Sequence, residues 1–132
     1  MEHNKSNKFE SAFLGVKVLR NDSVMFKSLS NTELGIWVAH GEGRFRMPYP
    51  EDRYNVFMKY SYQNYPANPN GSDYSIAGIC SDDGRHHAMM PHLERAFYPH
   101  HWACYPDERK NDELSPWVEA FINARKWIEK TI

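Results

Sequence analysis

Residues 54–62 alternate with the period of two that is typical of β-strands, with Val56, Met58, Tyr60 and Tyr62 on one face. Residues 34–39 differ, because they form a short continuous apolar run of the kind found in strands buried on both faces. The strand-like segments are residues 9–20, 34–39, 54–62, 74–80 and 85–90. The last two flank Ser81-Asp82-Asp83-Gly84, whose Asp-Gly pair is a strong hairpin signal. The pattern therefore predicts several strands, two of them joined by a tight hairpin.

The clearest single element is a helix at the C-terminal end of the chain. Ser115 is a good N-cap residue, and Pro116 suits the first helical position. One apolar stripe follows at helical spacing, formed by Trp117, Phe121, Ala124 and Ile128. We expect this stripe to face the core. Residues 98–114 are rich in Pro, Asp and Glu and predict irregular structure, and the polar residues 1–8 predict a frayed end.

Composition bounds the class of protein. A chain of 132 residues fits one domain or a piece of one, and 41% apolar with 25% charged residues is ordinary for a globular protein. The formal net charge of −1 argues against nucleic acid or an anionic membrane as a partner. The sequence has no apolar run of the ~20 residues that a membrane helix needs, and its start lacks the apolar core of a signal peptide. We expect a cytoplasmic protein.

His92 and Glu94 are the first candidates for chemistry. They stand two residues apart, so in an extended segment both side chains point the same way and Glu94 can hold His92 in one tautomer. Such a pair can serve as the base and the orienting carboxylate of a nucleophilic triad. The alternative is a surface histidine beside a helix-entry glutamate.

A nucleophile for such a triad is not evident. Cys80 ends a predicted strand before a hairpin turn, with no helix after it to lower its pKa, and Cys104 lies in irregular sequence. Two cysteines are also too few for a disulfide framework. A zinc site is a further hypothesis, because several histidines lie close together in the sequence. They are His86, His87, His92, His100 and His101, but their spacing matches no zinc-binding motif.

Four blocks of sequence occur in an order that identifies a family. They are Val38-Ala39-His40-Gly41-Glu42-Gly43-Arg44-Phe45, Tyr65-Pro66-Ala67-Asn68-Pro69-Asn70-Gly71-Ser72, Ala77-Gly78-Ile79-Cys80-Ser81-Asp82-Asp83-Gly84-Arg85 and Ala88-Met89-Met90-Pro91-His92-Leu93-Glu94-Arg95. Together they strongly resemble the glutaminase region of the phosphoribosylformylglycinamidine synthases, which are class I glutamine amidotransferases. The resemblance spans about residues 7–128.

The resemblance implies a mechanism and a fold. In this family a cysteine attacks the side-chain amide of glutamine and releases ammonia, which a synthetase domain uses with ATP and magnesium to convert formylglycinamide ribonucleotide to formylglycinamidine ribonucleotide. His92 matches the catalytic base and Glu94 its orienting carboxylate. His40, Glu42 and Arg44 are candidates for binding glutamine, with no metal and no cofactor in this segment. The implied fold is α/β and flavodoxin-like, a mixed sheet with flanking helices.

Two departures from the family pattern matter. Leu93 replaces the usual proline between the histidine and the glutamate. Neither cysteine matches the family's nucleophile, whose elbow belongs upstream, so we expect residues 1–132 to be one piece of the amidotransferase domain and inactive alone. Its expected partners are glutamine, the upstream part of that domain and the synthetase domain. The alternative is a non-catalytic remnant or interaction module with the same fold. Either way, we expect an uncovered sheet edge and apolar face.

Overall fold

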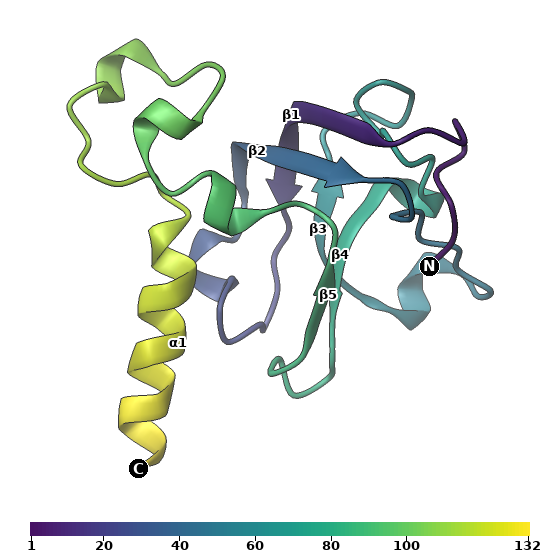
Figure 1. The fold of residues 1–132 in the computed structure, drawn as a ribbon. Helices are drawn as coiled ribbons and strands as arrows, with labels where there is room; N and C mark the ends of the chain where they lie inside the picture. The colour runs from purple at the N-terminus through teal and green to yellow at the C-terminus, as the bar shows by residue number, and fades with distance from the viewer.

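The computed structural model describes residues 1–132, which form one curled antiparallel sheet and one long helix (Figure 1). The strands are β1 (Glu10–Val18), β2 (Thr32–His40), β3 (Asn55–Tyr60), β4 (Ile76–Cys80) and β5 (His87–Met89), and the helix is α1 (Val118–Thr131). The order across the sheet is β2-β1-β3-β4-β5, and every neighbouring pair is antiparallel. The α/β class is confirmed, and this chain contributes only antiparallel strands to it.

The sheet is curled, and the chain after β5 contacts its opposite edge strand, β2. The backbone N–H of His92 donates to the carbonyl of Trp37, in the middle of β2, at 2.8 Å. The indole of Trp117 donates to the carbonyl of Gly35 on β2 at 2.8 Å. These contacts satisfy part of the free edge of β2 and place the segment around His92 against it.

The hydrophobic core fills the inside of this curl. Val16 of β1 and Ile36 of β2 are fully buried, and Phe57 of β3 stacks on Phe26 with the ring centroids 4.4 Å apart. The core cluster comprises Val16, Val18, Phe26, Leu29, Ile36, Val38, Phe57, Met58, Tyr60, Ala77, Leu93, Ala96, Trp117 and Ala120. Leu93 belongs to this cluster and so anchors the residues on either side of it.

The predicted elements are present with three differences. The helix begins at Val118, after a turn in which the Trp117 N–H donates to Ser115 Oγ at 3.3 Å. The prediction that residues 1–8 are frayed is wrong, because Asn4 is buried and Glu2 pairs with Arg44. The expected direction of the α1 apolar stripe also differs, as described below. No helix is both long and apolar enough to cross a membrane.

Candidate active site

The structure brings His92 and Glu94 into direct contact. The backbone of His92 is fixed by its bridge to Trp37, and the 3₁₀ turn η4 (Leu93–Arg95) follows immediately. The His92 Nδ1 and Glu94 Oε1 atoms lie 2.6 Å apart. The imidazole is half-buried and the carboxylate is exposed. The buried side chain of Leu93 holds the turn to the core, so the pair is anchored without a proline between its members.

The electrostatics of this pair favour an ionised carboxylate. Burial alone raises the pKa of Glu94, but a backbone hydrogen bond and the hydrogen bond from His92 outweigh it and hold the pKa below its usual value. A carboxylate can only accept, so the proton of a neutral His92 lies on Nδ1 and Nε2 keeps its lone pair. The arrangement can therefore take up a proton at Nε2. An open cavity of about 390 Å³ lies beside Glu94, lined by Trp37, Glu94, Arg95 and His101.

Neither cysteine is arranged as a partner for this histidine. Cys80 pairs with His87, at the end of β5 away from His92. Burial, followed by the charges of Asp22 and two further aspartates, raises the pKa of the Cys80 thiol. This direction is opposite to the one that activates a nucleophilic thiol. Cys104 is exposed and lies in the loop after Trp102.

His40 has a different environment at the end of β2. It is only 8% exposed, and its Nδ1 atom lies 2.8 Å from the side-chain amide nitrogen of Asn70. Burial lowers the pKa of His40. Asn70 Nδ2 also donates to Asn4 Oδ1 at 2.6 Å, and Asn70 Oδ1 accepts from the Tyr60 hydroxyl at 2.7 Å. Asn4 and Asn70 are both almost completely buried, so this is an interior polar network.

The hydrogen bonds of this network fix the orientation of each member. Asn4 Nδ2 donates to the carbonyls of His40, at 2.6 Å, and Lys8, at 2.9 Å, so Asn4 Oδ1 must be the acceptor. Asn70 therefore presents its NH₂ group to Asn4 and, with its second hydrogen, to His40. His40 Nδ1 must accept, which places the ring proton on Nε2. That Nε2 atom is buried and has no hydrogen-bond partner in this chain.

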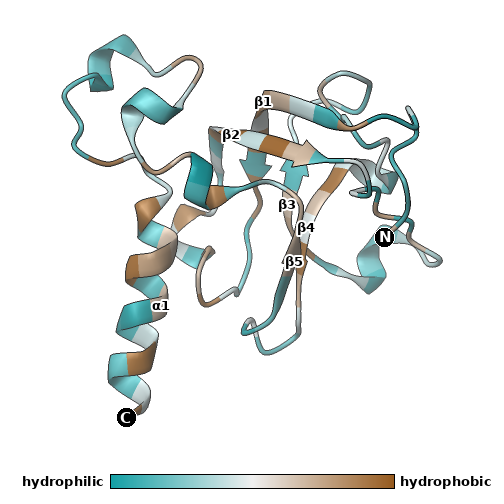
Figure 2. Cartoon of the chain, in the orientation of Figure 1, coloured by the Kyte–Doolittle hydropathy of each residue, from teal (hydrophilic) through white to brown (hydrophobic).

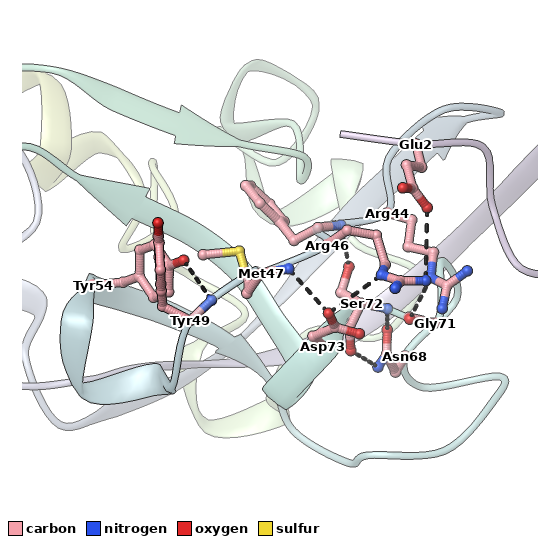
Figure 3. A network of polar contacts seen from close by, with 11 residues as sticks. Glu2, Arg44, Arg46, Met47, Tyr49, Tyr54, Asn68, Gly71, Ser72 and Asp73 are labelled. Atoms are coloured by element: carbon pink, nitrogen blue, oxygen red, sulfur yellow. Dashed lines mark hydrogen bonds and ion pairs between the residues drawn. The ribbon is translucent and has the colours of Figure 1, made fainter.

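Glu42 and Arg44 follow His40 in a loop. Figure 3 shows Arg44 beside the segment 68–73. Arg44 Nε donates to the Gly71 carbonyl at 3.1 Å, and its backbone pairs with that of Glu2. The exposed Glu42 carboxylate lies 3.5 Å from His3 Nδ1. Glu42 and Arg44 share an open cavity of about 610 Å³, lined also by Met1, Glu2, His3, Asn4, Lys5 and Asn7.

The loop after Arg44 is fixed by side chains of the segment 68–73. In Figure 3 the hydroxyl of Ser72 accepts from the Phe45 N–H at 3.1 Å, and Asp73 Oδ2 accepts from the Met47 N–H at 3.0 Å. Asn68 Nδ2 in turn donates to the Ser72 carbonyl at 2.9 Å. The loop that carries Glu42 and Arg44 is therefore positioned by polar contacts on both sides.

The predicted site residues thus form two groups. His92 and Glu94 make one, and Glu42 and Arg44 line the other, with His40 buried behind them. Sequence reasoning missed Asn4 and Asn70, because asparagines in polar, turn-rich segments usually indicate surface loops. The signal was the specificity of the Asn-Pro-Asn-Gly-Ser block itself, residues 68–72.

The histidine-rich segments do not assemble a metal centre. The chain contains no group of three His, Cys, Asp or Glu side chains placed to hold a metal ion. His87 Nε2 instead lies 2.6 Å from the buried hydroxyl of Ser23, and its ring packs against Phe26 and Phe57. The zinc reading has no support from this geometry.

A half-exposed histidine oriented by a carboxylate, at the edge of a curled sheet, fits the amidotransferase class that the motifs indicate. The chain belongs to the CobB/CobQ-like glutamine amidotransferase domain family, whose model matches residues 1–128. It is 38% identical over 139 residues to human phosphoribosylformylglycinamidine synthase and 40% identical over 144 residues to the Drosophila melanogaster protein of that name. A relative from Arabidopsis thaliana, named as a probable chloroplastic/mitochondrial form, is 40% identical over 146 residues.

These matches cover nearly all of this chain and a small part of each relative. They span 96%, 98% and 96% of this chain, and 10%, 11% and 10% of the human, fly and plant proteins. A solved structure of PurLQS from Thermotoga maritima superimposes with a TM-score of 0.70 at 26% identity, covering 96% of this chain and 51% of that chain. The resemblance seen in the motifs is therefore confirmed.

Proposed function

We propose that this chain supplies the general base of a glutaminase that serves purine biosynthesis, as part of a phosphoribosylformylglycinamidine synthase. The observation that carries the proposal is the 2.6 Å contact between His92 Nδ1 and Glu94 Oε1 on an accessible edge. The similarity to synthases of that name supports the pathway. The proposed location is the cytoplasm.

In the proposed reaction His92 Nε2 takes the proton of a cysteine thiol as the sulfur attacks the side-chain carbonyl of glutamine. The resulting imidazolium is stabilised by Glu94 and returns its proton to the departing ammonia. The neutral Nε2 then takes a proton from water as the water oxygen attacks the glutamyl thioester. That proton returns to the departing cysteine thiolate, and glutamate is released. A positioned base of this kind contributes ~10²–10⁴-fold to the rate.

The cysteine in this scheme comes from outside the 132 residues. The raised pKa and position of Cys80, and the loop position of Cys104, do not suit the role. Residues 1–132 are then one piece of an amidotransferase domain, inactive without the part that carries the thiol. Its partners are that part and the synthetase domain.

We assign glutamine recognition to the loop that follows His40. The cavity shared by Glu42 and Arg44 presents both a carboxylate and a guanidinium, which match the ammonium and the carboxylate of an amino acid. His40 supports this loop from behind. ATP and magnesium belong to the synthetase domain in this scheme, as the resemblance to the synthases implies.

The test is reconstitution. This chain would be co-expressed with the segment of the Drosophila relative that directly precedes the matched region, and glutamate release from glutamine would be measured. We expect hydrolysis by the pair, a loss of at least ~100-fold with His92→Ala, and a smaller loss with Glu94→Ala. Hydrolysis that survives His92→Ala would overturn the assignment. A stable pair without any hydrolysis would favour the non-catalytic alternative.

A further inference from the structure

The apolar stripe of α1 is largely uncovered. Trp117, at the start of the stripe, is buried, but Phe121 is 41% exposed and Ile128 is 51% exposed. At helical spacing Phe121, Ala124 and Ile128 lie on one side of the helix. The expectation that this side faces the core is therefore wrong beyond its first turn.

A different side of α1 packs against the rest of the chain. Asn123 Nδ2 donates to the Met25 carbonyl at 2.9 Å and to Ser28 Oγ at 2.6 Å. The Arg85 guanidinium lies 5.3 Å from the centre of the Trp127 ring. Hydrophobic positions recur down the helix to its end, which projects beyond the sheet (Figures 1 and 2). The packed side is thus mixed in character, while a more apolar side stays open.

The open side continues toward the candidate active site. The Phe97 and Phe121 rings are in edge contact at 4.9 Å, and Leu114, just before the helix, is 42% exposed. Ser115 ties the start of the helix to this region, because its N–H donates to the Phe97 carbonyl at 2.7 Å. The apolar surface therefore extends beyond the helix to Leu114 and Phe97. From here on, the name α1 stripe means the four residues Phe97, Leu114, Phe121 and Ile128. It begins three residues after Glu94.

We propose that the α1 stripe is the docking surface for the thiol-bearing part of the amidotransferase domain. The inference rests on the proposed function. The occupant follows from two observations: the matched PurLQS chain has about as many residues outside the match as inside it, and Phe97, where the stripe begins, lies three residues after Glu94. Docking along the stripe covers apolar surface and places the second part beside the base that must reach its thiol.

The test uses the co-expressed pair described above, with this chain carrying the affinity tag. Phe121→Asp and Ile128→Asp place a charge in the stripe. Ile122→Asp is the matched control, because Ile122 is 37% exposed on the same helix but points away from the stripe. We expect each stripe variant to lower recovery of the partner at least ~10-fold, a loss typical of a buried interface residue, and the control to retain it. Light scattering of this chain alone, with and without Phe121→Asp, measures self-association.

The outcomes separate this proposal from the proposed function. If all three variants recover the partner equally well, or all three lose it equally, the docking proposal is overturned, even if His92-dependent hydrolysis is intact. A dimer of this chain that Phe121→Asp dissociates would also overturn it, because the occupant is then a second copy. Stripe-dependent recovery without His92-dependent hydrolysis would support the surface and contradict the proposed function.

Discussion

Two histidines in this molecule are held through the same ring atom by partners of opposite kind. His40 Nδ1 meets a buried amide, Asn70, at 2.8 Å, whereas His92 Nδ1 meets an exposed carboxylate, Glu94, at 2.6 Å. The amide donates and the carboxylate accepts, so the two rings carry their protons on opposite nitrogens. His40 keeps Nε2–H inside the protein, and His92 keeps a free Nε2 at an accessible edge.

We propose that the region of His40 supports the fold and that the region of His92 takes part in the reaction. The region of His40 joins three segments of the chain, the N-terminal residues, the end of β2 and the segment 68–73, through hydrogen bonds that leave few groups unpaired. The side chain of His92 makes one polar contact, to Glu94, and open space lies beside the pair. We expect changes at the first region to act on stability, and changes at the second to act on the reaction.

The largest expected effect on stability comes from Asn70→Ala. The change removes three buried hydrogen bonds, to Asn4, His40 and Tyr60, and leaves His40 Nδ1 and the Tyr60 hydroxyl without partners. We expect the free energy of unfolding to fall by about 3 kcal/mol in urea titrations. Asn64→Ala, at an exposed position in the same loop, should change it by less than about 0.5 kcal/mol. Similar effects of both changes would remove the distinction between the two regions.

A second change tests how tightly the loop after β2 is packed on this network. A Cβ atom on Gly43 would lie 2.6 Å from His40 Nδ1 and 2.7 Å from Asn70 Nδ2, whereas one on Gly41 would meet nothing nearer than 4.0 Å. Gly43→Ala should therefore cost about 2 kcal/mol, and Gly41→Ala should be close to neutral. Thermal unfolding of the two variants measures the difference. A neutral Gly43→Ala would mean that the network is loose.

Acidification should weaken the fold. Burial lowers the pKa of both His40 and His87, so below the unfolded value of about 6.5 the unfolded chain binds protons that the folded chain does not. The free energy of unfolding should therefore fall as the pH drops from 6.5 toward the folded pKa values. Urea titrations between pH 7.5 and 5 measure this slope, and His87→Gln should make it shallower. A fold that gains stability over this range would contradict the assignment of buried, neutral rings.

Of the changes to the two histidine regions, His92→Ala should affect stability least. The ring is half-buried and its partner is exposed, so its removal should cost less than about 1 kcal/mol. The same change should abolish hydrolysis by the reconstituted pair. A loss of stability as large as that of Asn70→Ala would place His92 among the structural residues instead.

Most of the fold could be predicted from the sequence. Each strand-like segment forms a strand, and the hairpin turns at Ser81–Gly84 as the Asp-Gly pair indicates. Periodicity failed where tertiary packing decides the outcome. Phe57 and Met58 are neighbours that alternation assigns to opposite faces, yet both are buried, beside an irregular register between Val56 and Met58. The pattern of α1 likewise indicated which side is apolar and could not indicate what covers it.

The candidate site was predictable where its chemistry is local. His92 and Glu94 stand two residues apart, and the spacing alone indicates their contact. Asn4 and Asn70 are 66 residues apart, and no local pattern shows that two asparagines will meet in the interior and orient a third residue. His40 itself is almost buried, which no local pattern indicates, and its role in binding glutamine stays a prediction.

The most direct test of this account is the position of the proton on each ring, read from ¹⁵N–¹H long-range correlations of this chain above pH 7.5. We predict Nδ1–H for His92 and Nε2–H for His40. Glu94→Ala should release the preference at His92 and leave His40 unchanged. A proton on Nε2 of His92, with Glu94 in place, would contradict the claim that this histidine is held ready to act as a base.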